Sequence, residues 1–427
     1  MRRIKVKPKF YIIILCLLAA VLLTVLGVKL IKQAIEKANQ PAPIDPVKPK
    51  AAVTVTVNYD ASILSENTAV TEALETFVKN QYTAIANLEN SDMKPSFTSP
   101  EGEQAWRNQA ALQLLIDIRL GQKTDLTMKS MDCSLLVTKV SVSEKTVSLE
   151  ALESSECRFN CSANTASKVG DVKVSFTLDS SSGEMKIASY DRNDEFFQMI
   201  DALYQGGTAG QNGVETAMLA VKENCLSKVK ENIKRMDSSL AEYLAGKAET
   251  YAAAQNPYKR ADALEYASTY ALSRNPQFLD FTTLGGNCQN YASQILRAGG
   301  IPNDMDGEEK WKYYSDAYDI TGQAKGRTPS WTSVTGFLDY AQKNTGYGLS
   351  AAVGANIFTL EGGDLIICTD IRGEKVHTLA AASLIYDEAG NAADILTFSS
   401  SINRKNYPLR AYCYCDYTGI KILGWNE

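Results

Sequence analysis

The chain has 427 residues with a formal net charge of −5 at pH 7, and 45% of its residues are hydrophobic. This length predicts two or three domains with real cores, and nine cysteines are too few for a disulfide-dense scaffold. The sequence has no basic stripe with interleaved aromatic residues, which argues against a nucleic-acid partner.

Residues 10–28 form an uncharged apolar run, and five basic side chains precede it within residues 1–9. A helix of about 20 apolar residues can cross the core of a bilayer, and basic residues ahead of it favour a cytoplasmic N-terminus. We therefore predict a cytoplasmic tail over 1–9 and one transmembrane anchor over 10–31, with the bulk of the chain outside the cell membrane. A cleaved signal peptide is the competing interpretation, but the apolar run is longer than is usual for one.

The next three segments differ in composition. Residues 32–52 hold four prolines among lysine, glutamine and alanine, which predicts an extended spacer. Residues 53–205 read as a strand, two helices and then several strands. That order resembles the small cone-shaped α+β folds of the nuclear-transport-factor type. Residues 206–257 are rich in alanine, lysine, glutamate and leucine and predict a helical connector.

The cysteines outside the apolar run suggest bonds to each other more than to a metal. Cys157 and Cys161 have no second ligand pair or histidine nearby, so a disulfide is the favoured interpretation. Cys413 and Cys415 lie on one face of a predicted strand, which would strain a bond between them, and one of them could pair with Cys368. The sequence predicts no metal site and no cofactor.

Residues 258–427 are predicted to begin with helices and to end in a sheet. Cys288 follows two glycines and Asn287, and apolar residues recur after it at helical spacing. A helix start favours a thiolate because unpaired backbone N–H groups stabilise negative charge there. His377, the only histidine in the chain, lies in a strand-like run. Together the two residues predict a thiol nucleophile and its base, against the alternatives of a buried structural thiol and a histidine that only fills space.

Several motifs in this last part carry a family resemblance. Residues 258–300 combine a Tyr-Lys-Arg-Ala helix start, an Asn-Pro turn, Gly-Gly-Asn-Cys-Gln-Asn-Tyr-Ala-Ser-Gln and a closing Ala-Gly-Gly. With Trp311, Ser330–Trp331 and Gly363–Asp364, this pattern resembles the bacterial putative amidase domain family, which is grouped with papain-like cell-wall amidases and endopeptidases. The resemblance implies a papain-like α+β domain over 258–427, with Cys288 as nucleophile and His377 as base.

Two departures from the family pattern bear on the site. Asn287 and Gln289 flank the cysteine where the family usually has aspartate and threonine. By alignment, Ser400 stands where the family commonly has a histidine, shortly before Asn403 and Arg404. A third polar group orients the imidazole of such a pair and selects its tautomer. The resemblance leaves Ser400, Asn403 or a backbone carbonyl for this role.

The remaining site predictions concern the oxyanion and the substrate. The backbone N–H of Cys288 is the predicted oxyanion donor, because amides at a helix start point at the developing charge. Asn287 and Gln289 are predicted to add polar groups near it. Trp331 is predicted to form a wall of the substrate cleft, with a place in the core as the alternative.

The predicted fold class is therefore α+β multidomain: a transmembrane helix, a small α+β domain, a helical connector and a papain-like amidase domain. The predicted function is a membrane-anchored extracytoplasmic cysteine amidase or peptidase that cleaves cell-wall peptides or glycopeptides through a Cys288 thioester. A catalytically silent module that binds a cell-wall peptide or an envelope protein is the alternative, because Ser400 replaces the family histidine. A transglutaminase-like acyl transferase would share the same pair, and the sequence gives no oligomeric state.

Overall fold

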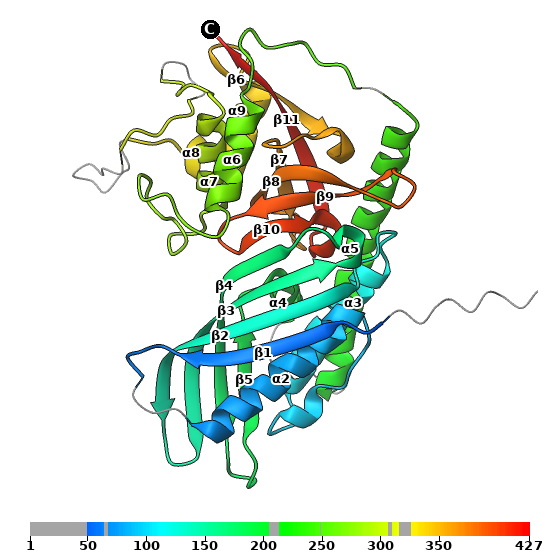
Figure 1. Ribbon diagram of the computed structural model, residues 1–427, viewed down its shortest axis with the longest axis vertical. Coiled ribbons are helices and arrows are strands. Elements are labelled where there is room, and N and C mark those ends of the chain that lie inside the picture. Colours follow the sequence, from blue (N-terminus) through cyan, green and yellow to red (C-terminus); the bar gives the residue numbers. More distant parts are fainter. Residues whose placement is uncertain (1–48, 64–66, 205–212, 248, 306–309, 316–325) are drawn as a thin grey trace, which may run out of the picture. The chain divides into compact units, whose positions relative to one another are not determined.

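The fold is built on one mixed sheet of eleven strands within the compact unit Lys50–Glu427 (Figure 1). Ten strands follow the order β1-β2-β3-β4-β10-β9-β8-β7-β11-β6, and β5 pairs with β4 outside this path. The computed structural model describes residues 49–427 except 64–66, 205–212, 248, 306–309 and 316–325.

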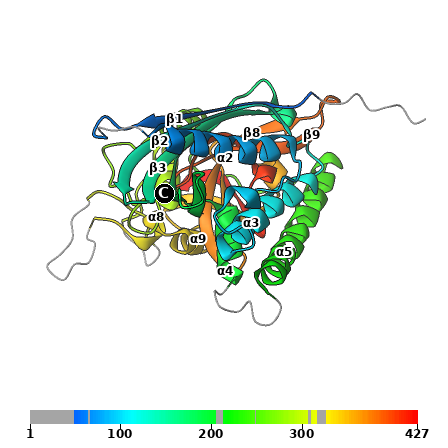
Figure 2. The same cartoon turned by 90° about the horizontal axis from the view of Figure 1, so that it is seen from below.

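The first part of this unit packs helices against one face of its strands. Its elements are β1 (Ala52–Tyr59), α2 (Thr68–Asn87), η1 (Lys94–Ser96), α3 (Glu103–Leu120), β2 (Met128–Val142), β3 (Thr146–Phe159), η2 (Asn160–Ser162), β4 (Ser167–Asp179), β5 (Lys186–Arg192), α4 (Glu195–Leu203) and α5 (Gly213–Leu244). β1 runs parallel to β2, and the pairs from β2 to β5 are antiparallel. Along β2, Leu135 and Val137 are buried while Leu136 is exposed, as the two-residue period of a strand requires. α2 and α3 cover the buried face (Figure 2).

The second part places helices first and strands after them. Its elements are α6 (Arg260–Tyr270), α7 (Cys288–Ala298), α8 (Pro329–Thr332), α9 (Val334–Lys343), β6 (Gly348–Ala355), η4 (Ile357–Thr359), β7 (Leu365–Thr369), β8 (Lys375–Tyr386), β9 (Ala392–Ser399), β10 (Asn403–Pro408), η5 (Leu409–Ala411) and β11 (Asp416–Asn426). β7 is buried along its whole length. Its side chains alternate between two hydrophobic clusters, with Leu365 and Ile367 in one and Ile366 and Cys368 in the other. The sheet therefore lies between two cores.

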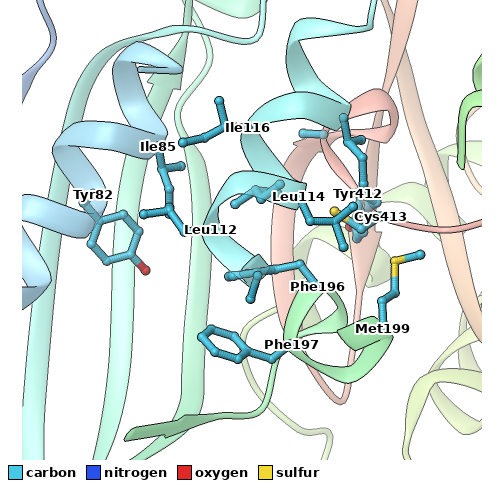
Figure 3. Packing of buried hydrophobic residues seen from close by; sticks show 14 of the residues in the cluster. Tyr82, Ile85, Leu112, Leu114, Ile116, Phe196, Phe197, Met199, Tyr412 and Cys413 are labelled. Carbon is cyan, nitrogen blue, oxygen red and sulfur yellow. The ribbon is translucent and has the colours of Figure 1, made fainter. Parts of the chain in front are cut away.

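The larger core continues from the first part into the second. Figure 3 shows Leu114 of α3 and Phe196 of α4 between Ile85 of α2 on one side and Tyr412 and Cys413 on the other, and all of them belong to this core. Side chains far apart in the sequence therefore share one packed interior. Because such interiors are close-packed, a change of side-chain volume in one part of the unit affects the packing of the other part.

This arrangement corrects the predicted fold class. The prediction put separate sheets in residues 53–205 and 258–427, whereas β4 and β10 pair antiparallel in one sheet, with Arg404 opposite Val169. Local periodicity reports which face of a strand is buried but not which strand lies beside it. The pairing of β4 with β10 could therefore not be predicted from the sequence pattern. The predicted domain boundaries remain a prediction.

The predicted membrane localisation is also corrected. Within the described ranges, no helix combines the length and the apolar character that a bilayer crossing needs. α5, at 32 residues, is long enough, but charged side chains occupy its exposed face. The predicted tail over 1–9 and anchor over 10–31 lie outside the described residues.

The described cysteines, eight in number, are all free thiols. The expected disulfide between Cys157 and Cys161 is therefore not formed. Cys157 is buried in the core from β3, whereas Cys161 lies in the short helix η2 that follows. The pairing expected for Cys368 is likewise absent.

Candidate active site

Cys288 is the first residue of α7, and a turn of two glycines leads into it. Gly285 and Gly286 have φ angles of 112° and 118°, in a region that residues with a Cβ rarely adopt. The side-chain carbonyl of Asn287 accepts hydrogen bonds from the backbone N–H of Phe281 at 3.1 Å and from the Asn290 amide at 2.9 Å. Asn287 thus fixes the turn that delivers the cysteine to the helix start.

The loop between β9 and β10 also forms hydrogen bonds with Asn287. The backbone N–H of Asn287 donates to Ser401 Oγ at 2.5 Å, and its side-chain amide donates to Ser400 Oγ at 3.0 Å. Ser401 has a φ of 92°, which is uncommon for a residue other than glycine. Ser400, predicted to orient the imidazole, is thus bonded to the neighbour of Cys288.

Gln289 fastens the start of α7 to β8. Its side-chain carbonyl accepts a hydrogen bond from Thr378 Oγ1 at 2.8 Å, and its amide donates to Ser293 Oγ at 3.3 Å. Gln289 is fully buried, so either of its polar groups would be costly to leave without a partner. Because Thr378 directly follows His377, this bond holds the strand of the histidine against the helix of the cysteine.

Cys288 and His377 line one pocket of about 430 Å³. Each has an exposed fraction of 6%, so both residues are almost wholly buried. The other walls come from the glycine turn, the β9–β10 loop, the β7–β8 turn, α4 and the segment between η5 and β11. The structure thus brings the two predicted reacting residues to one solvent-connected space.

The thiol of Cys288 is subject to opposing effects. Burial raises its pKa above the ordinary value, and the backbone N–H groups of Thr378, Gln289 and Cys288 itself lower it. The N–H groups of Cys288 and Gln289 lie at the start of α7, where they stabilise negative charge. The N–H group of Thr378 comes from β8. Burial is the larger effect, so the resting thiol is neutral at pH 7.

The imidazole of His377 is neutral as well. Burial, and then the positive charge of Arg404, lowers its pKa to about 3. Its ring stacks on Tyr414, with centroids 6.1 Å apart and planes at 15°. In the described part of the chain no hydrogen bond joins it to Cys288, Ser400 or Asn403. A neutral imidazole can accept a proton, so the resting pair is a thiol and a free base.

Asn403 and Trp331 lie away from this pocket. The carbonyl of Asn403 accepts a hydrogen bond from Arg274 at 2.9 Å, and its amide donates to Asp171 at 3.4 Å. Trp331 is fully buried, and its indole N–H donates to Asn290 of α7 at 2.9 Å. Both side chains hold elements around the site, and neither lines it.

A comparison with protein families bears directly on these residues. The family model described as putative amidase domain matches residues 257–422. Those residues are therefore similar to this family, and we refer to them as the putative amidase domain. The match holds Cys288, His377 and the loop of Ser400, and it confirms the resemblance predicted for 258–427. Searches of curated proteins and of solved structures found no match.

The putative amidase domain does not form the whole pocket. Asn193, in the turn between β5 and α4, and Glu195 and Gln198 of α4 also line it, and all three precede the matched residues. Glu195 has a buried ion pair with Arg404 of β10 at 2.8 Å, and Asp194 pairs with the same guanidinium at 2.9 Å. The two parts of the unit thus meet in charged contacts beside the site.

Sequence reasoning missed three residues that shape the pocket. Thr378 could have been found, because residues next to a strand histidine alternate between the faces of the sheet and one must meet the helix. Ser401 and Glu195 gave no local signal. Ser401 accepts its hydrogen bond in the turn between β9 and β10, which forms only when these strands pair. Glu195 belongs to α4, which is far from Cys288 and His377 in the sequence.

Proposed function

We propose that this protein is a cysteine-dependent amide hydrolase in which Cys288 attacks the carbonyl carbon of the substrate. The observation that carries the proposal is the shared pocket, in which a thiol at a helix start and a neutral imidazole both reach the same space. The putative amidase domain supports an amide as the reacting bond.

The reaction has two halves. The sulfur of Cys288 adds to the carbonyl carbon while its proton passes to His377, and the backbone N–H of Cys288 stabilises the oxyanion. The carbon–nitrogen bond then breaks, and the imidazolium gives its proton to the departing amine. Water adds to the resulting thioester, the carbon–sulfur bond breaks, and a carboxylic acid leaves as the thiol is restored.

The substrate that we propose is a peptide amide, with a cell-wall peptide or glycopeptide as the first form to test. The resemblance to cell-wall amidases motivates this choice. Gly285 and Gly286 line the pocket without side chains, which supports the close approach of an extended main chain.

Specific observations favour a second function, a catalytically silent module that binds such a peptide. Within the described residues, Cys288 and His377 make no hydrogen bond to each other. The pKa of the thiol is raised and that of the imidazole is lowered, so no ion pair of thiolate and imidazolium forms at rest. Ser400, in the place of the family histidine, contacts Asn287 instead.

The two functions are separated by incubating the full chain with purified cell-wall peptides and following new amino groups by mass spectrometry. The variants are Cys288→Ala and, as matched control, Cys413→Ala, which removes another buried thiol of the same pocket. We expect product from the wild type and from Cys413→Ala, and none from Cys288→Ala. Product from Cys288→Ala would overturn the cysteine mechanism. Binding without any product from the wild type would favour the silent module.

A further inference from the structure

Glu195 lines the pocket of Cys288 and His377 although it lies outside the putative amidase domain. It is the first residue of α4 and has an exposed fraction of 5%. Burial first, and then the charge of Glu195, raises the pKa of Tyr414. Burial, then Cys288 and then Glu195 raise the pKa of Cys368. Tyr414 stacks on the imidazole, and Cys368 pairs with His377 in the sheet. The Glu195 carboxyl is therefore close to the groups around the histidine.

The ion pairs that hold Glu195 contain more carboxyl groups than guanidinium groups. Arg404 pairs with Asp194 and Glu195, and Arg192 pairs with Asp194 and with Glu153 at 2.6 Å. Two guanidinium groups thus face three carboxyl groups. When all three carboxyls are ionised, this set holds one negative charge in excess, and it is removed from water.

Arg119 does not correct this excess by direct pairing. It lines the same small cavity of about 40 Å³ as Glu195. Its guanidinium donates instead to Tyr407 at 2.7 Å and to the backbone carbonyl of Ala411. An uncompensated charge away from water is costly. In keeping with this, burial raises the pKa of Glu195 to about 7 against the lowering effect of the Arg404 charge, and the charge of Asp194 adds to the rise.

We propose that Glu195 is a specificity-determining residue of this site and that it binds an ammonium group of the substrate. A bound ammonium supplies the positive charge that the set of ion pairs lacks, and it holds the carboxyl in its ionised form. The other charged side chains described along the pocket, Asp370 and Arg372, lie on the β7–β8 turn and have opposite signs. Asn193 and Gln198, bonded to each other at 2.9 Å, add polar groups beside Glu195.

This inference rests on the proposed function, because it gives the substrate chemistry of the same pocket. It assigns to α4 the choice of substrate and to the putative amidase domain the reaction. The substrate class is then a peptide with a free amino group near the amide that reacts.

The test uses thiol reagents, which report charge in the pocket without any hydrolysis. The full chain is treated at pH 7 with 2-aminoethyl methanethiosulfonate, a cation, and in parallel with neutral methyl methanethiosulfonate. Peptide mapping by mass spectrometry gives the rate of modification of Cys288 by each reagent. After normalisation to a small free thiol, we expect the cation to react about fivefold faster or more, because a nearby carboxylate attracts it in a partly desolvated space.

Two variants with the same change of charge complete the experiment. Glu195→Gln keeps the size of the side chain, and we expect the rate ratio to fall to about one. Glu374→Gln removes an exposed carboxylate from the β7–β8 turn, and we expect it to keep the wild-type ratio. Equal normalised rates on the wild type would overturn the proposal, whether or not Glu195→Gln folds. A ratio unchanged in Glu195→Gln would overturn it too. Hydrolysis that depends on Cys288 would leave the proposed function standing in either case.

Discussion

His377 matters in two ways at the scale of the single residue: it is the base of the proposed reaction, and its burial makes folding sensitive to acid. The folded pKa is about 3, below the ordinary value of 6.5. Between these two values the unfolded chain binds a proton that the folded chain does not. Stability from this group is therefore complete above about pH 6.5 and is lost as the pH falls toward 3.

We predict that His377→Gln removes this part of the acid sensitivity. Between pH 7 and pH 4 the wild type should lose about 3 kcal/mol more unfolding free energy than the variant, since each pKa unit is worth about 1.4 kcal/mol. Denaturant titrations at the two pH values measure the difference. Carboxylates titrate in both proteins and cancel. Equal losses in the two proteins would show that the imidazole is not buried in its neutral form.

The two residues proposed to react were easier to single out in the sequence than the residues around them. Cys288 was singled out by its place after a glycine pair at a predicted helix start. His377 was singled out because it is the only histidine in the sequence. The role of Ser400 came from alignment alone, and the structure places its hydroxyl on Asn287. Glu195 could not be found, because its place in the pocket depends on how distant elements pack.

At the scale of the element, the docking of α7 on β8 decides how the thiol and the imidazole meet. A side-chain hydrogen bond from Thr378 to Gln289 joins the two elements beside the residues proposed to react. The helix and the strand were each predicted from periodicity. The contact between them was not predicted, because the spacing of apolar residues shows which face of an element is buried but not which element packs against that face.

We predict an energetic coupling between these two residues. Thr378→Val and Gln289→Met each leave a buried polar group without its partner, and the double variant removes both groups. A double-mutant cycle on the unfolding free energy should therefore give a coupling of about 1 kcal/mol or more. Thr378→Val with the exposed change Glu374→Gln is the matched control and should give additive effects. Additive effects in the first cycle would mean that the bond does not join the elements.

At the scale of the whole molecule, the shared sheet and the buried ion pairs join the first part of the compact unit to the putative amidase domain. β4 pairs with β10, and Arg404 of β10 reaches Asp194 and Glu195 at the start of α4. The order of helices and strands within each part was largely readable from the sequence. That the strands of both parts form one sheet could not be read from the sequence, since strands that pair across a long sequence separation leave no local pattern.

We predict that Arg404→Met destabilises the compact unit by about 3 to 5 kcal/mol, because it leaves buried carboxylates without their partner. Arg372→Met, an exposed change on the β7–β8 turn, is the control and should stay within about 0.5 kcal/mol. Denaturant unfolding followed by tryptophan fluorescence measures both. A small effect of Arg404→Met would mean that the ion pairs do not bind the two parts together.

The central claim, that Cys288 is the nucleophile, is tested most directly by trapping its thioester. The full chain is mixed with a cell-wall peptide, quenched in acid within the first turnovers, and mapped by mass spectrometry. Our account predicts an acyl group on Cys288 and none on two other buried thiols, Cys368, which pairs with His377 in the sheet, and Cys413, which lines the same pocket. Peptide hydrolysis that proceeds with Cys288 unmodified at every quench time would contradict it.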